Sequence, residues 1–231
     1  MASEARSVPL FQLYFHELLW LVTAICKNCE LIFRNTDPPT DGHFINVDPE
    51  LHARIATVLI NAANFKKLLV APTVRPKAQP LELFEFRKRR AKILATALAG
   101  IDMNEMFNVK VRNSIEHFDE YLDEANLELA AAKTPPSPLA AYNMTFSSWE
   151  LMSPRPYPVR LYIADKRMFH NLKYSVDLGK LYNEALTVRG RLLETPALSG
   201  VKEPGGLMVP LGPKPNEPDA QDAIVLRRKR R

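Results

Sequence analysis

The chain has 231 residues, of which 46% are hydrophobic and 25% charged, and this composition is that of an ordinary globular protein with its own core. The formal net charge is +5, and the last five residues, 227–231, carry as many positive charges as this whole excess. The rest of the chain is electrically balanced, which excludes a protein whose entire surface attracts nucleic acid.

The two cysteines, Cys26 and Cys29, are too few for a disulfide framework. They lie inside a predicted helix, so we predict two buried thiols. The longest uncharged apolar stretch, residues 18–26, is too short to cross a membrane, and the N-terminal residues lack the layout of a signal peptide. We therefore expect a cytoplasmic protein that has no membrane partner and, because no ligand cluster is present, no metal or other cofactor.

Helical periodicity predicts three helices in the first hundred residues. The first spans about residues 9–35 and is apolar nearly all round, as is typical of a central helix or of one half of a dimer interface. The second begins after Asp48, an N-cap residue followed by Pro49. The third covers about residues 81–99 and ends at Gly100.

A fourth helix is predicted from a capping box at 102–105 to about residue 132. Its apolar positions form a narrow stripe, which consists of Val111, Ile115, Phe118, Leu122, Ala125 and Leu129. The charged residues between 113 and 132 are all acidic. Two interpretations of the basic run at 87–90 on the third helix follow: a nucleic-acid patch, or a surface that these acids neutralise.

After the fourth helix, six prolines between residues 135 and 158 interrupt the helical pattern. Short strands are predicted at 142–149, 159–164 and 168–176, with a hairpin turn at 165–167. So little sheet is not stable alone. We therefore expect a small antiparallel insertion at about 140–176, before a last helix that Asp177 caps.

The predicted fold class is mainly α: an up-and-down bundle of about five helices, with the β insertion between the fourth and the last helix. One domain is expected to cover residues 1–194. Residues 195–231 are rich in proline and glycine and are predicted to form a disordered tail with a basic C-terminus.

Three residues of the predicted fourth helix, Arg112, Asn113 and His117, suit chemistry on a phosphate. An arginine binds phosphate oxygens through a planar set of donors, and a histidine titrates near neutral pH and transfers protons. With about 100° of rotation per residue, Arg112 and His117 lie on opposite sides of the apolar stripe. If the two act together, either the helix is locally distorted or a second protomer supplies the missing partner across a two-fold axis.

The segment RNSIEH at 112–117 resembles the R-N-x-x-x-H form of the R-x4-6-H motif of the HEPN superfamily (higher eukaryotes and prokaryotes nucleotide-binding). The resemblance covers about residues 10–132 and 177–194, and it implies an all-α bundle that usually dimerises. Many members of this superfamily are metal-independent endoribonucleases of toxin–antitoxin and antiphage systems, and others are non-catalytic. By this resemblance His117 is the general acid/base acting on a ribose 2′-hydroxyl, Arg112 holds the scissile phosphate, and Asn113 orients the phosphate or the imidazole.

Two functional hypotheses follow. In the first, the protein is a homodimeric HEPN-like endoribonuclease of toxin–antitoxin or defence type, with RNA as its substrate and an antitoxin or another protein as a partner. In the second, it is a non-catalytic homodimeric interaction or scaffold protein, in which Arg112 and Glu116 form an intrahelical ion pair and His117 is inert. The acids from Glu116 to Glu128 favour the second hypothesis, because they are an unusual lining for a groove that admits RNA.

Overall fold

The computed structural model describes residues 10–206 and 208. Its helices are α2 (Leu13–Asn35), α3 (Pro49–Leu69), α4 (Leu81–Ala97), α5 (Lys110–Glu116), α6 (Phe118–Ala131) and α7 (Leu178–Leu193), with short 3-10 helices η1 (Trp149–Leu151) and η2 (Pro196–Leu198). Its strands are β1 (Ile45–Asn46), β2 (Ala140–Tyr142), β3 (Thr145–Phe146), β4 (Tyr157–Val159), β5 (Leu161–Ile163), β6 (Met168–Asn171) and β7 (Tyr174–Asp177). The described part of the chain is mainly helical, as the sequence predicts.

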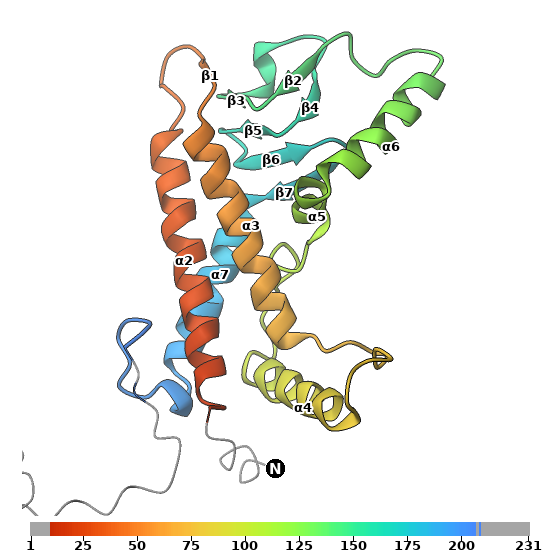
Figure 1. The fold of residues 1–231 in the computed structure, drawn as a ribbon. Helices are drawn as coiled ribbons and strands as arrows, with labels where there is room; N and C mark the ends of the chain where they lie inside the picture. The colour runs from red at the N-terminus through yellow and green to blue at the C-terminus, as the bar shows by residue number, and fades with distance from the viewer. Residues whose placement is uncertain (1–9, 207, 209–231) are drawn as a thin grey trace, which may run out of the picture.

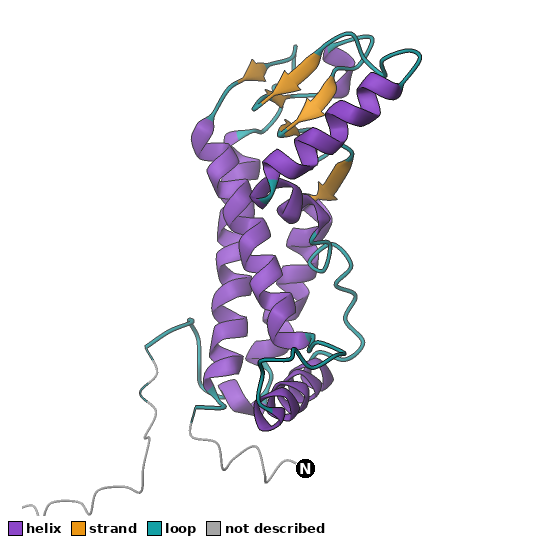
Figure 2. Cartoon of the chain, turned by 45° about the vertical axis from the view of Figure 1, so that its right-hand side comes forward, coloured by secondary structure: helices purple, strands orange, loops and turns teal. Residues whose placement is uncertain are grey.

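Three long helices, α2, α3 and α7, lie side by side and contain most of the core (Figures 1 and 2). Leu18 and Val22 of α2 are fully buried, as are Ile55 of α3 and Leu181 of α7. Each such side chain contributes about 1.5–3 kcal/mol on burial. The prediction of a buried first helix is confirmed, and among the described residues no helix is both long and apolar enough to span a membrane.

The predicted helix starts at α3 and α7 are confirmed by their caps. The Asp48 carboxylate accepts hydrogen bonds from the backbone N–H groups of Glu50 and Leu51. The Asp177 carboxylate accepts one from the N–H of Lys180. Both carboxylates satisfy amides that have no partner inside the helix, so local sequence fixes these two boundaries.

Cys26 and Cys29 are free and buried in α2, as predicted. Burial raises the pKa of the Cys26 thiol to about 11 and raises the pKa of Cys29 as well. Both groups are therefore protonated thiols near neutral pH and lack the thiolate needed for redox chemistry.

The sheet is larger than the predicted insertion, and it is mixed rather than antiparallel. Five strands lie in the order β1-β3-β5-β6-β7, in which β3 and β5 are parallel, and β2 and β4 form a second, parallel pair. The predicted hairpin around residues 165–167 is present between β5 and β6. The sheet also extends outside 140–176, because Ile45 of β1 pairs with Phe146 of β3, and local periodicity does not reveal such a distant pairing.

The prediction of an up-and-down bundle of about five helices is also corrected, because only three helices of the described part of the chain lie side by side. Figure 1 shows that α4 lies across one end of the long helices, whereas α6 lies at the other end beside the sheet. The predicted fourth helix is two helices, α5 and α6, with His117 between them. The helix also begins later than predicted, at Lys110 instead of near residue 102. The preceding segment forms an isolated turn, in which the Glu184 carboxylate of α7 accepts hydrogen bonds from the N–H groups of Glu105 and Met106 (3.1 and 2.9 Å).

The folded part continues beyond the predicted end at residue 194. Leu198 of η2 is fully buried in the core, and the Gln12 side-chain amide donates to the Ala197 carbonyl (3.0 Å). Residues 195–201 therefore belong to the folded domain, because one apolar side chain anchors a segment whose composition is that of a tail. The rest of the predicted tail, including the basic run, lies outside the described residues, except for 202–206 and Met208.

Candidate functional site at the helix break

The three residues singled out by the sequence lie at the bend between α5 and α6. The backbone N–H of His117 donates to the carbonyl of Asn113 (2.9 Å) and closes the last turn of α5. His117 then leaves the helical conformation, with φ −109° and ψ 47°, and α6 begins at the next residue. Of the two alternatives considered from the sequence, the local distortion is therefore present.

A buried asparagine of the sheet stabilises this bend. In an unbroken helix the carbonyl of Ser114 would accept a hydrogen bond from the N–H of Phe118. Here the Asn171 amide donates to that carbonyl (3.0 Å) and to the Ser114 hydroxyl oxygen (2.9 Å). The Asn171 carbonyl oxygen accepts from the N–H of Arg160 (3.2 Å). Ser114 and Asn171 are fully buried, so these hydrogen bonds satisfy groups that water does not reach.

Arg112 is partly buried and already has two partners. Its guanidinium forms an ion pair with Glu116 and donates to Oδ1 of Asn113 (3.1 Å). Its side chain is 20% exposed, and its buried Nε has no hydrogen-bond partner among the described residues. Arg112 therefore keeps free donor capacity, but Glu116 offsets its charge, as the spacing of four residues predicts.

His117 is the exposed member of the three. Its side chain is 55% exposed, and Nδ1 lies 3.9 Å from a carboxylate oxygen of Glu120. Among the described residues, no side-chain hydrogen bond or ion pair joins His117 to Arg112 or Asn113. The structure thus brings Arg112 and Asn113 together and leaves the histidine of the same protomer apart from them.

The acids of α6 do not neutralise the basic run 87–90, which corrects one of the two interpretations of that run. α4 and α6 lie at opposite ends of the molecule (Figure 1). Two of the acids, Glu124 and Glu128, lie beside Lys173 in the β6–β7 turn. Arg90 of the basic run instead donates to the backbone carbonyl of Lys67 (3.0 Å).

A hollow of about 370 Å³ adjoins α5 and was not predicted from the sequence. It is lined by Val47, Pro49, His52, Ala53, Ala56, Ile115, Asn143, Arg160 and Phe169. Ile115 is three residues from Arg112 and therefore lies near the same face of α5. His52 and Arg160 were missed because they are distant in sequence, and no short motif joins them.

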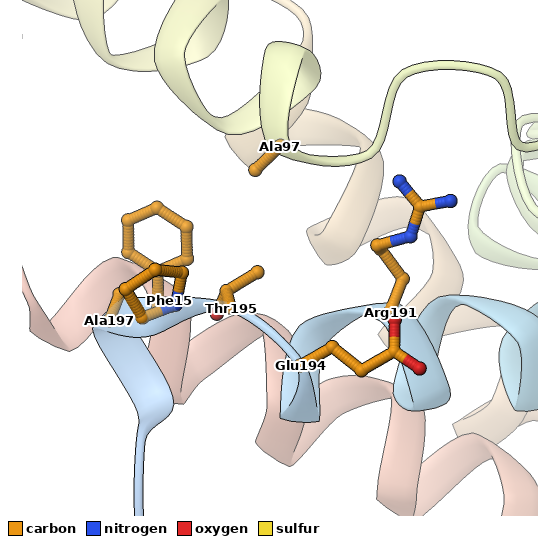
Figure 3. Close-up of a pocket in the computed structure, with 7 residues that line it drawn as sticks. Phe15, Ala97, Arg191, Glu194, Thr195 and Ala197 are labelled. Carbon is orange, nitrogen blue, oxygen red and sulfur yellow. The ribbon is translucent and has the colours of Figure 1, made fainter.

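A second hollow, of about 430 Å³, lies where the start of α2, the end of α4 and the end of α7 meet (Figure 3). Arg191 of α7 and Glu194, the residue after α7, bring opposite charges to it, and Phe15 contributes an apolar side chain. It contains none of the three motif residues. Among residues 10–206 and 208, no group of three or more His, Cys, Asp or Glu side chains is arranged to hold a metal ion.

Comparisons of the chain with protein-family models, with curated proteins and with solved structures gave no match. The resemblance to the HEPN superfamily therefore rests on the motif at 112–117 and on the helices around it.

Proposed function

We propose that the protein is a dimeric, HEPN-like, metal-independent endoribonuclease that cleaves RNA at the bend between α5 and α6. The observation that carries the proposal is the arrangement of the motif. A partly buried arginine contacts an asparagine, and an exposed histidine lies beside a carboxylate where the helix is broken. A toxin–antitoxin or defence role, with an antitoxin or another protein as partner, is part of the same proposal.

In the proposed reaction, neutral His117 accepts the proton of a ribose 2′-hydroxyl. The 2′-oxygen attacks the adjacent phosphorus, the bond to the 5′-oxygen of the next nucleotide breaks, and that oxygen takes a proton from solvent. The products are a 2′,3′-cyclic phosphate and a free 5′-hydroxyl. Arg112 donates hydrogen bonds to the phosphate oxygens on which negative charge develops, and Asn113 orients the phosphate.

We infer that a second protomer completes the proposed site, because no hydrogen bond or ion pair joins Arg112 and His117 of one chain among the described residues. In a two-fold dimer, Arg112 and Asn113 of one protomer would face the partner subunit's His117, and the same arrangement would occur twice. Each dimer would then contain two composite sites.

The first test is RNA cleavage by the full chain in the presence of EDTA. We expect His117→Ala and Arg112→Ala each to lower the rate by at least about 100-fold, with 2′,3′-cyclic phosphate ends in the products of the unmodified protein. His43→Ala and Arg89→Ala, which change an exposed histidine and an exposed arginine elsewhere, are the matched controls and should cleave normally. Full activity of His117→Ala would exclude the proposed mechanism.

The composite site is tested by mixing the two inactive variants. A heterodimer of His117→Ala and Arg112→Ala contains one site with both substitutions and one intact site. After subunit exchange, cleavage should recover to about a quarter of the normal rate, because about half of the dimers are mixed and each has one of two sites. No recovery in a mixture shown to exchange subunits would place Arg112 and His117 of one protomer in the same site.

The Arg112–Glu116 ion pair favours a second candidate, a non-catalytic homodimeric interaction protein. The large exposed apolar side chains of α2, among them Trp20 at 55% exposure, provide an apolar surface for such a dimer. If this second candidate is correct, neither the unmodified protein nor any variant should cleave RNA, and Trp20→Glu should convert a dimer into a monomer in light scattering. Glu116→Gln separates the two functions, because it frees Arg112 and should strengthen RNA binding only if Arg112 holds a phosphate.

A further inference from the structure

The hollow beside α5 is lined by an arginine, Arg160, that forms no ion pair with the other described residues. Its guanidinium carbon lies 4.3 Å from the centroid of the Phe118 ring, and its buried Nε has no hydrogen-bond partner among the described residues. A partly buried cation without an anion costs free energy, which an anionic ligand would offset.

The backbone is strained where two of the lining residues lie. Arg160 and Asn143 both have φ of +52°, in the left-handed region that side chains other than glycine rarely adopt. Such a conformation costs free energy, which the surrounding structure must offset. Asn171 accepts the N–H of Arg160 (3.2 Å), and Val159 accepts the N–H of Asn143 (2.9 Å). The fold thus maintains a costly conformation at two polar residues of one hollow.

His52 adds a polar group that is otherwise unused. Both ring nitrogens are buried and have no hydrogen-bond partner among the described residues, and the ring lies edge-on to Phe169 at 6.0 Å. Burial is the main cause that lowers the pKa of His52; Arg160 lowers it further, and Asp48 acts in the opposite direction. His52 is therefore neutral near pH 7 and provides one donor and one acceptor.

We propose that this hollow binds a small carboxylate ligand with an apolar body. One guanidinium matches one negative charge, and a carboxylate accepts two parallel hydrogen bonds from it. His52 and the Asn143 amide offer further donors, and the remaining lining residues, Val47, Pro49, Ala53, Ala56, Ile115 and Phe169, are apolar. The volume of about 370 Å³ suits a ligand of this size. The proposal is independent of the ribonuclease function, because it uses none of the three motif residues.

Isothermal titration calorimetry of the full chain with four probes tests the chemistry. Benzoate has both the charge and an apolar body, benzyl alcohol lacks the charge, acetate lacks the apolar body, and phenyl phosphate carries a larger charge on the same ring. We expect benzoate to bind at least tenfold more tightly than each of the other three. Benzoate binding that is no tighter than that of acetate or benzyl alcohol overturns the proposal, and tighter binding of phenyl phosphate overturns the assignment to a carboxylate.

Two variants test the location. Arg160→Met should weaken benzoate binding at least tenfold. Arg167→Met is its matched control, because Arg167 has the same φ of +52° and stacks at the same distance, 4.3 Å, over Phe33. Ala56→Leu fills the hollow from α3 without changing a charge and should also abolish benzoate binding. It tests the location of the site even if Arg160→Met does not fold. Benzoate affinity that is unchanged in Ala56→Leu excludes this hollow as the binding site.

Discussion

α5 and α6 are adjacent in the chain and share one apolar stripe, but they pack against different parts of the molecule. Val111 and Ile115 of α5 contact the core formed by α2, α3 and α7. Phe118, Leu122 and Ala125 of α6 instead pack on the sheet side, against Val159 and Leu172. One stripe thus serves two hydrophobic clusters, because the helix bends at the residue between them. The bend depends on a tertiary contact, the Asn171 amide, rather than on a glycine or proline in the helix.

The largest loss of stability is expected from Asn171→Leu, which removes the side chain that contacts the bend between α5 and α6. The substitution leaves the buried Ser114 carbonyl and the Arg160 N–H without the partner that Asn171 provides, and it removes one donor from the Ser114 hydroxyl, which keeps its hydrogen bond to the Val111 carbonyl. We expect the free energy of unfolding to fall by about 2–4 kcal/mol, measured by urea denaturation. Asn183→Leu, at an exposed position of α7, is the control and should change it by less than about 0.5 kcal/mol. An equal effect of both variants would mean that Asn171 does not hold the bend.

Smaller losses of stability are expected from substitutions in the two halves of the apolar stripe, and they should differ between α5 and α6. Val111 is fully buried in the main core, whereas Leu122 is partly buried beside the sheet. We expect Val111→Ala to lower the free energy of unfolding by about 2 kcal/mol, because two methyl groups are lost and a cavity remains. Leu122→Ala should cost only about 1 kcal/mol, although it removes more atoms. The reverse order in urea denaturation would show that α6 is the better anchored helix.

The smallest expected effect is a loss of stability in acid, caused by two histidines, His52 of α3 and His170 of β6. Burial lowers the pKa of His170 below the ordinary value of 6.5. The pKa of His52 is also lowered, and burial is the main cause. The unfolded chain therefore takes up protons first as the pH falls. The stability that neutral His52 and His170 contribute is fully present above about pH 6.5 and is lost as the pH falls from there towards their folded-state pKa values.

The melting temperature should accordingly decrease between pH 7 and pH 5. His170→Phe keeps an aromatic ring beside Trp149, which His170 contacts edge-on at 5.2 Å, and removes one of the titrating groups. Its melting temperature should decrease less over the same range. An identical decrease in the variant would assign the acid sensitivity to other groups.

Features that depend on neighbouring residues were predicted correctly from the sequence. The caps at Asp48 and Asp177 and the Arg112–Glu116 pair need only the residues of their own helix. The β5–β6 hairpin likewise follows from local alternation and a turn. Local chemistry therefore fixes helix starts, short turns and contacts along one helix.

Features that involve distant partners were not predicted, except that a local distortion of the fourth helix was one of two alternatives. The bend at His117 contacts Asn171, strand β1 pairs with Phe146, and Leu198 is buried beyond the predicted end of the domain. The same holds for the site. The sequence singled out Arg112, Asn113 and His117, but it could not show that a hollow with His52 and Arg160 lies next to their helix. A regular apolar period indicates which side of a helix is buried, but not whether the helix remains straight.

The packing of α7 on α2 has a consequence for biosynthesis. The Tyr182 hydroxyl donates to the Glu30 carboxylate (3.0 Å) across 152 positions of sequence, and α7 is the last of the three long helices to be translated. Contacts between such distant segments slow folding, and a nascent chain exposes apolar surface until its partner segment is made. The side of α2 that α7 covers therefore stays exposed to solvent until residues 178–193 have been translated.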